Sequence, residues 1–525
     1  MSTGRSLILA LFLGLALLCV GNVSPKVGAQ SDAPQMLVAD LGVRPVVANL
    51  ITPISMAFIG TNDFLLLEKN TGQVKRVVGG EVQGTVLDLG VNFASERGLL
   101  GIATHPNFPS NPGVYLFWTC RSTALPTDPF FPDETRCLDA NMFAADTDQI
   151  LQVPLLGNRV DRFVWNGSSL TFDHNLIMLR AFQNDGAPVP PNQGDEAQPA
   201  RGNHDGGPMR FGPDGKLYIF FGDNGRRGQL QNLPCGPTAN CPGPAQPDDQ
   251  FGGPEPDDAH LSGVILRLNA DGTTPTDNPF FAAGAAMNNE VGRNIQKIFA
   301  YGLRNGFGMD FDPISGALWE QENGDDTFSE LNRVEPGFNS GWVQIMGPPE
   351  RIAQYKEVET SLGTDPCLGT PYFGLQQLRW SPVLIADSAG EALSRLFVLP
   401  GSHYSEPEFS WKFEVAPGGI GFVRGRALGP QYEGDLFMGG ARPFLEGGHL
   451  FHFNLTGNRR KIGVDDPRLE DRVADNLCKF DITESESLLI GRNFGTLTDI
   501  VSGPNGNLFL VSIDKSSVFE IFRRP

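Results

Sequence analysis

The sequence has little that would mark a haem, zinc or nucleic-acid protein. Its 525 residues include seven cysteines, none spaced as CxxCH or CxxC. The missing CxxCH excludes covalently attached c-type haem, and the missing CxxC pairs leave no zinc signature. Basic residues are outnumbered 40 to 60 by acidic ones, which gives a formal net charge of −20. Such an acidic surface argues against nucleic acid and anionic membranes as partners.

Long apolar runs are also scarce. The one candidate, residues 7–20, is too short to span a bilayer comfortably. Arg5 precedes it, and the small residues at 27–29 suit a cleavage site, so residues 1–29 are predicted to be a secretory signal peptide. An uncleaved anchor and, less favoured, a lipoprotein at Cys19 are the alternatives. We therefore expect a periplasmic or secreted protein with no membrane span after signal removal.

Removal of the signal leaves an even number of cysteines, which in an exported chain suggests disulfides. Cys120 and Cys137 bracket one segment rich in Pro and Asp, and Cys235 and Cys241 bracket another, so each pair is a candidate for a local disulfide. Cys367–Cys478 follows as the third pair only by elimination.

Amphipathic helical patterns are rare, whereas short turn-and-strand units recur. An Asp-Gly, Asn-Gly, Ser-Gly, Gly-Asp or Asn-Asp turn precedes an apolar run at five places: 64–67, 216–221, 317–319, 436–438 and 507–511. Such turns supply the positive φ that a tight hairpin needs. Their repetition predicts an all-β fold, namely a β-propeller.

The spacing of these units is uneven, so long loop insertions must separate them. Insertions are expected at four segments rich in Pro, Asp, Gly or Asn: 121–148, 183–203, 228–260 and 349–375. Two β-sandwich domains are the alternative fold. Because no linker divides the chain into halves, we predict a single propeller domain over residues 30–525.

Three stretches carry chemistry. His204 lies among glycines just before a predicted strand, where an imidazole can take a proton from an alcohol. Arg304 and Asn305 lie in a Gly-rich turn, where a guanidinium can bind a carboxylate or an oxyanion. Residues 319–332 hold five acids whose oxygens suit calcium, although not with EF-hand spacing. A turn-capping His, a loop-tying Arg and a solvated acidic loop are the plainer alternatives.

In this order the stretches resemble the glucose/sorbosone dehydrogenase family, which includes the soluble quinoprotein glucose dehydrogenases. The matching elements are His204 before 213–218, the Gly-Asp at 222–223, Arg304-Asn305, 322–324, 330–332 and 337–342. Flanking matches lie at 96–101, 105–108, 264–279, Trp411 and 415–417. The resemblance is good over residues 45–345 and weaker elsewhere.

The resemblance implies a six-bladed propeller that holds pyrroloquinoline quinone (PQQ) on its axis. His204 would be the general base on a sugar hydroxyl, with hydride passing to PQQ, and Arg304 would stabilise charge on the quinone oxygen. The cofactor would also meet residues at five further positions: Glu96, Asn305, Asn323, Lys412 and Arg442.

The resemblance also implies calcium. The carbonyls of Gly324 and Asp325 would face a PQQ-bound ion, and Glu330 would serve a structural calcium. Two departures from the family pattern stand out: Gly306-Phe307 replaces a common Pro-Gln, and Asp325 stands where Pro is common.

The predicted function is therefore a PQQ- and calcium-dependent dehydrogenase of an aldose or related sugar, which passes electrons to a separate acceptor. A non-catalytic propeller that binds carbohydrate or protein is the main alternative, and a calcium-dependent lactonase on a similar propeller is a third. The dehydrogenase requires His204, Arg304 and the 322–330 loop to converge at one end of the central channel.

Overall fold

All five predicted hairpins form in the computed structural model, which describes residues 33–93, 95–120, 156–181, 204–224, 261–288, 290–360, 363–372, 385–440 and 447–525. Pro34–Pro525 form one compact unit. Several predictions lie outside the described residues: the signal peptide, Arg442, three of the cysteines, and the insertions at 121–148, 183–203 and 228–260. The insertion predicted at 349–375 begins with a short 3-10 turn and a helix.

The described strands form six sheets of four to six strands and one two-stranded ribbon. The first sheet contains β3 (Pro53–Gly60), β4 (Asp63–Glu68), β5 (Gln73–Val78) and β6 (Glu81–Asp88). The second contains β7 (Leu99–Thr104), β8 (Gly113–Thr119), β9 (Leu156–Trp165) and β10 (Leu170–Arg180). The third contains β11 (Met209–Phe211), β12 (Leu217–Phe221), β13 (Val264–Leu268), β14 (Ile298–Tyr301), β18 (Phe338–Asn339) and β19 (His403–Tyr404).

The fourth sheet contains β15 (Gly308–Phe311), β16 (Leu318–Glu322), β17 (Thr327–Val334), β20 (Phe409–Phe413) and β26 (Val473–Ala474). The fifth contains β21 (Pro417–Phe422), β22 (Leu436–Gly440), β23 (His449–Phe453), β27 (Leu489–Arg492) and β1 (Gln35–Met36). The sixth contains β28 (Leu497–Ser502), β29 (Leu508–Ser512), β30 (Ser517–Arg523) and β2 (Leu41–Val47). The ribbon pairs β24 (Leu455–Thr456) with β25 (Lys461–Ile462).

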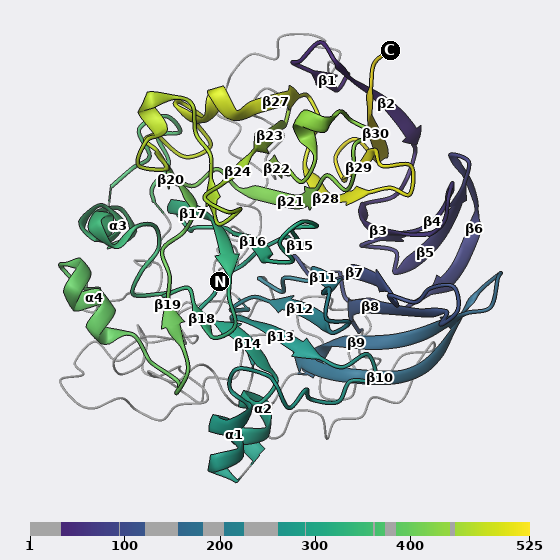
Figure 1. Ribbon diagram of the computed structural model, residues 1–525, viewed down its shortest axis with the longest axis horizontal. Coiled ribbons are helices and arrows are strands. Elements are labelled where there is room, and N and C mark those ends of the chain that lie inside the picture. Colours follow the sequence, from purple (N-terminus) through teal and green to yellow (C-terminus); the bar gives the residue numbers. More distant parts are fainter. Residues whose placement is uncertain are drawn as a thin grey trace, which may run out of the picture. The chain divides into compact units, whose positions relative to one another are not determined.

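One strand of each sheet faces a common centre (Figure 1). These inner strands contact one another in a closed circuit that runs β3, β7, β11, β15, β21, β28 and back to β3. Radial sheets around a closed ring define a β-propeller, so the two-sandwich alternative does not describe this chain. The end of this ring that carries the loops after β12 and β16 bears the candidate site.

Apolar side chains fill the spaces between neighbouring sheets. Trp319, Trp411 and Phe409 are fully buried in a cluster that joins the fourth and fifth sheets. Phe409 and Trp411 meet edge to face with ring centroids 4.8 Å apart, an arrangement that aromatic pairs favour. Burial on both faces explains why a strand such as β12 reads as a continuous apolar run rather than an alternating one.

The ring is closed by strands from opposite ends of the chain. In the sixth sheet, β2 pairs antiparallel with β30, with Leu41 opposite Arg523 and Val43 opposite Ile521. β28, β29 and β30 thus complete a sheet whose outer strand comes from the N-terminal part of the chain.

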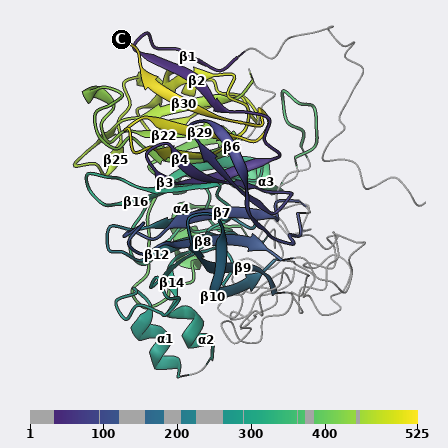
Figure 2. The same cartoon turned by 90° about the vertical axis from the view of Figure 1, so that its right-hand side faces the viewer.

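The few described helices are short and peripheral. They are α1 (Phe281–Met287), α2 (Glu290–Ile295), α3 (Ile352–Thr360) and α4 (Ala389–Arg395), with 3-10 turns at Pro349–Arg351, Pro430–Tyr432, Pro467–Leu469 and Ser485–Leu488. α1 and α2 project from the outer side of the third sheet in both views (Figures 1 and 2). Among the described residues, no helix combines the length and apolarity that a membrane crossing requires.

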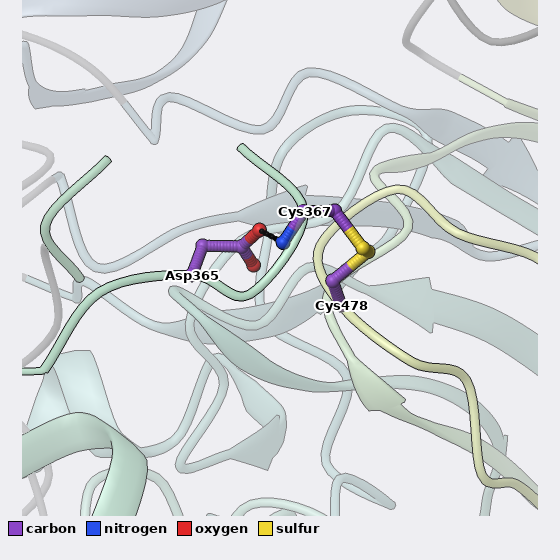
Figure 3. Close-up of side chains that lie close together, drawn as sticks. All are labelled: Asp365, Cys367 and Cys478. Atoms are coloured by element: carbon purple, nitrogen blue, oxygen red, sulfur yellow. Dashed lines mark hydrogen bonds between the residues drawn. A yellow bond between two sulfur atoms is a disulfide. The ribbon is translucent and has the colours of Figure 1, made fainter. Parts of the chain in front are cut away.

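The Cys367–Cys478 disulfide is present and confirms the third predicted pair (Figure 3). It links the segment after α3 to the segment after β26. The partners predicted for the other two pairs include Cys137, Cys235 and Cys241, which lie outside the described residues, so those pairs stay predictions.

Candidate active site

His204 lies in a constrained turn at one end of β11. Its φ is +61°, in the left-handed region, and its N–H donates to Glu96 Oε2 at 2.8 Å. Gly206 follows at φ +69°, where a Cβ would lie 2.6 Å from the Phe220 carbonyl oxygen. The glycine-rich sequence is therefore needed to bring this backbone against β12.

The imidazole of His204 is held by a buried carboxylate. Its Nδ1 lies 2.6 Å from Asp223 Oδ1, and Trp342 Nε1 donates to Asp223 Oδ2 at 2.9 Å. Burial alone would raise the pKa of Asp223, but His204, Arg304 and Trp342 outweigh it and the pKa is lowered. An ionised Asp223 accepts the Nδ1 proton, so the neutral ring keeps its lone pair on Nε2. Nε2 is then the basic atom.

Glu96 joins His204 to Asn305. Its Oε2 accepts from the His204 N–H and, at 3.0 Å, from Asn305 Nδ2. Glu96 belongs to the loop before β7, whereas Asn305 lies between β14 and β15. Two of the predicted cofactor-contacting residues thus meet beside the predicted base.

Arg304 is buried, with 4% of its surface exposed. Its Nη1 donates to the carbonyls of Asn323 (2.7 Å) and Gly324 (3.1 Å), and its Nη2 donates to Asp325 Oδ1 at 3.0 Å. Its Cζ lies 5.5 Å from the Trp342 ring centroid, within range of a cation–π interaction. Burial lowers the pKa of Arg304, but the nearby acids, Asp325 first, raise it overall.

Two polar atoms beside the base have no partner among the described residues. They are Arg304 Nε and Asn305 Oδ1, both fully buried. Buried donors and acceptors are nearly always paired in native proteins, because an unpaired one costs about 1–3 kcal/mol. These atoms are positioned to bind a polar ligand.

The two carbonyls predicted to face calcium both accept hydrogen bonds from cationic side chains. The Gly324 carbonyl accepts from Arg304, and the Asp325 carbonyl accepts from Lys479 Nζ at 2.8 Å. Lys479 also donates to Asp326 Oδ1 at 2.7 Å. Lys479 was not predicted from the sequence to belong to the site.

Glu330 lies in a separate group of buried acids. It faces Glu322 across the β16–β17 pair, and its Oε2 accepts from Asn332 Nδ2 at 2.9 Å, as does Oε1 of Glu320. Burial raises the pKa of Glu330 to about 7 and raises that of Glu320 and Glu322 as well. No hydrogen bond described here links Glu330 to His204 or Arg304, so its metal role stays a prediction.

Of the two remaining predicted cofactor residues, Lys412 makes no described contact with this cluster. Lys412 is half-buried in β20 with its ammonium 5.3 Å from the Phe413 ring centroid. Arg442 lies outside the described residues. Their contact with the cofactor remains a prediction.

Asp223 and Trp342 are the functional residues that the sequence analysis quoted without a role. The signal for Asp223 was its place in the Gly-Asp pair that follows β12, and the signal for Trp342 was its place at the end of 337–342. Both became interpretable only when the fold brought them to His204, because the hydrogen-bonded atoms of Trp342 and Asp223 are 119 residues apart in sequence.

Asp205 is a buried acid whose protonation should govern pH-dependent stability. Its Oδ1 accepts from Asn158 Nδ2 at 2.7 Å, whereas Oδ2 has no partner among the described residues. Burial raises the pKa of Asp205 from 3.8 to about 7. The folded state thus holds this proton more tightly than the unfolded state, so its stabilisation is complete below about pH 4 and is lost as pH rises through 7.

We therefore expect Asp205→Asn to flatten the fall in unfolding free energy between pH 5 and pH 8 by at least ~1 kcal/mol, because the amide stays neutral throughout. Urea denaturation at both pH values measures this difference. Equal pH dependence in the two proteins would contradict the assignment.

The sequence profile described as Glucose / Sorbosone dehydrogenase matches residues 50–128 and 194–361. The chain is 29% identical to quinoprotein glucose dehydrogenase B of Acinetobacter calcoaceticus over 310 residues, 58% of this chain and 52% of that protein. It is 25% identical to aldose sugar dehydrogenase YliI of Escherichia coli over 316 residues, 60% of this chain and 58% of that protein. The matches thus span about half the length of these curated relatives.

Solved structures share the fold. The soluble aldose sugar dehydrogenase of Escherichia coli in its apo-form has a TM-score of 0.54 at 20% identity, covering 92% of this chain and 99% of that one. The PQQ-bound aldose sugar dehydrogenase of Streptomyces coelicolor has a TM-score of 0.50 at 21% identity, covering 94% of this chain and all of that one. At these identities the likeness shows the propeller fold alone.

Proposed function

Because the chain belongs to the glucose/sorbosone dehydrogenase family, we propose that it is a PQQ-dependent dehydrogenase of an aldose or related sugar. The observation that carries the proposal is the His204–Asp223 pair, 2.6 Å apart and buried beside Arg304 and Asn305. A base with an orienting carboxylate next to a fixed cation is what abstraction of hydride from an alcohol requires.

The residues around His204 fit PQQ by their chemistry. The cofactor is a polyanion with quinone oxygens, and the unpaired Arg304 Nε can donate to such an oxygen. The unpaired Asn305 Oδ1 and the carboxylate of Glu96 are acceptors for its ring N–H or for a sugar hydroxyl. Asn323, Lys412 and Arg442 complete the proposed set of cofactor contacts.

The roles of the protein groups follow from their bonds. When bound, PQQ supplies the two-electron acceptor for hydride. His204 Nε2 takes the hydroxyl proton, and Asp223 stabilises the imidazolium that results, because its carboxylate already holds Nδ1. Trp342 fixes the second oxygen of Asp223, which keeps the carboxylate and therefore the ring in one orientation.

The proposed metal site uses hard oxygen donors. The carbonyls of Gly324 and Asp325 accept hydrogen bonds from Arg304 and Lys479, and the carboxylates of Asp326 and Glu414 also lie beside Lys479. Carbonyl and carboxylate oxygens of this kind suit calcium. A calcium ion there would hold the cofactor in place. Glu330 is proposed for a separate structural ion.

The proposal also covers the number of blades, the export of the protein and its electron acceptor. We assign one blade to each of the six larger sheets, which gives the six-bladed propeller that the resemblance implies. We propose further that the protein is exported to the periplasm or beyond and passes electrons to a separate acceptor.

Calorimetric titration of EDTA-treated protein with PQQ, with and without calcium, tests this function. We expect binding that strengthens with calcium, followed by reduction of a dye when aldoses are added. Absence of PQQ binding at every calcium concentration would contradict the proposal and would favour the non-catalytic propeller that binds carbohydrate or protein.

A further inference from the structure

Lys479 reaches the loop that carries the two carbonyls assigned to calcium. Its ammonium lies 2.8 Å from the Asp325 carbonyl oxygen and 2.7 Å from Asp326 Oδ1, and Glu414 Oε2 lies 3.7 Å away. Only 10% of the Lys479 side chain is exposed. A cation of the protein itself therefore occupies an oxygen atom that a metal ion would need.

Two bonds hold the backbone at Lys479 in place. Cys478, which precedes it, is bonded to Cys367. The Lys479 N–H donates to Asp365 Oδ2 at 2.8 Å, and Asp365 Oδ1 accepts from the Cys367 N–H at 3.0 Å (Figure 3). The position of Lys479 is thus determined by the disulfide of the preceding residue and by the Asp365 carboxylate, which binds both of the segments that the disulfide joins.

The three polar residues in Figure 3 are not themselves the metal site. The sulfurs of Cys367 and Cys478 are joined to each other, so neither offers a thiolate. The Asp365 carboxylate already accepts three backbone N–H groups, from Cys367, Leu368 and Lys479. This group holds a loop in place, and its effect on the site acts through Lys479.

Acidic side chains gather around the loop. Four buried acids lie there: Asp325, Asp326, Glu359 and Glu414. Arg304 and Lys479 are the cations that contact them. Removal of Lys479 would take a positive charge away from the carboxylates of Asp326 and Glu414 and from the carbonyl oxygen of Asp325.

We propose that Lys479 and a divalent cation compete for the oxygen atoms of residues 325 and 326, so that Lys479 sets the affinity of this site for calcium. An ammonium and a calcium ion that share one carbonyl oxygen repel each other, because the two charges then lie only a few ångströms apart. The flexible four-carbon stem of lysine lets the ammonium leave while the disulfide keeps its backbone in place. The inference rests on the proposed function only for the identity of the metal.

Calorimetric titration of cofactor-free protein with calcium chloride tests the competition. Lys479→Gln is expected to bind calcium at least about tenfold more tightly than the unchanged protein, since the competing charge is gone. Lys356→Gln is the matched control, because Lys356 also donates to a carbonyl, that of Ile385, and to the carboxylate of Asp387. Equal affinity of the two variants, or no calcium binding by either, would overturn the proposal.

A second measurement uses the unchanged protein. Acetylation of lysines followed by mass spectrometry should show faster modification of Lys479 when calcium is bound than when it is absent. Protection of Lys479 that stays the same at saturating calcium would overturn the competition. Neither measurement needs PQQ or a sugar. If the protein binds no PQQ, the proposed function is wrong, but both measurements can still support the competition between Lys479 and calcium.

Discussion

Replacement of His204 by alanine is expected to lower kcat for sugar oxidation by roughly 10²–10⁴-fold, the usual contribution of a positioned general base. The dissociation constant of PQQ should change little, because the proposed cofactor contacts lie on Arg304, Asn305 and Glu96. Stopped-flow dye reduction gives the rate, and calorimetry gives the binding. A variant that keeps kcat within tenfold of the unchanged enzyme would assign the base elsewhere.

A matched control lies in the fifth sheet. His452 Nε2 lies 2.7 Å from Asp435 Oδ2, so the protein contains a second His–Asp pair outside the site. His452→Ala should leave kcat unchanged, which would separate loss of the base from general loss of stability.

The orienting role of Asp223 can be measured in the same assay. Asp223→Asn keeps the shape of the side chain but removes the charge that favours imidazolium. We therefore expect kcat to fall while urea denaturation shows that the variant is still folded. A fall in kcat that urea denaturation traces to unfolding would show that Asp223 only supports the fold.

Removal of the Cys367–Cys478 disulfide is expected to lower the unfolding free energy by about 4 kcal/mol. The bond closes a loop of 111 residues, and the entropy that a cross-link removes from the unfolded chain grows with loop length. The bond also links the segment after α3 to the segment after β26, and both segments support the loop that contains Asp325.

Guanidinium denaturation of a Cys367→Ser/Cys478→Ser variant measures this difference. The unchanged protein should lose stability when a reductant is added, whereas the variant should not respond at this bond. A loss below ~1 kcal/mol would mean that the hydrogen bonds of Asp365 hold these segments together without the covalent link.

The fold could be predicted where a short turn sequence identifies a hairpin. Gly-Asp, Asn-Gly and similar pairs identified the hairpins β3–β4, β11–β12, β15–β16, β21–β22 and β28–β29, which are the two inner strands of five sheets. The hairpin β7–β8 was missed because residues 105–112 connect it with prolines and no glycine. The alternation of apolar and polar residues was no guide in strands buried on both faces.

The site could be predicted only where its residues lie within short motifs. His204, Arg304, Asn305 and Asn323 belong to such motifs, and the fold brings them together with Glu96. Lys479 had no local signal, since 154 residues separate it from Asp325, and a lysine after a cysteine has no characteristic spacing. A contact of this kind follows from the path of the chain around the ring and not from composition.

The pairing of β2 with β30 also determines when the protein can finish folding. Leu41 of the outer strand β2 lies opposite Arg523 of β30, so β2 has no partner in this sheet until β30 has been synthesised. Contacts between residues so far apart form late, because the entropy of closing the intervening chain must be overcome first. A nascent or C-terminally truncated chain would present β2 as an unpaired edge, which is a hazard for aggregation. The same pairing means that proteolytic loss of β30 would also detach β2 from the sixth sheet, because the hydrogen bonds of β2 in that sheet are made to β30.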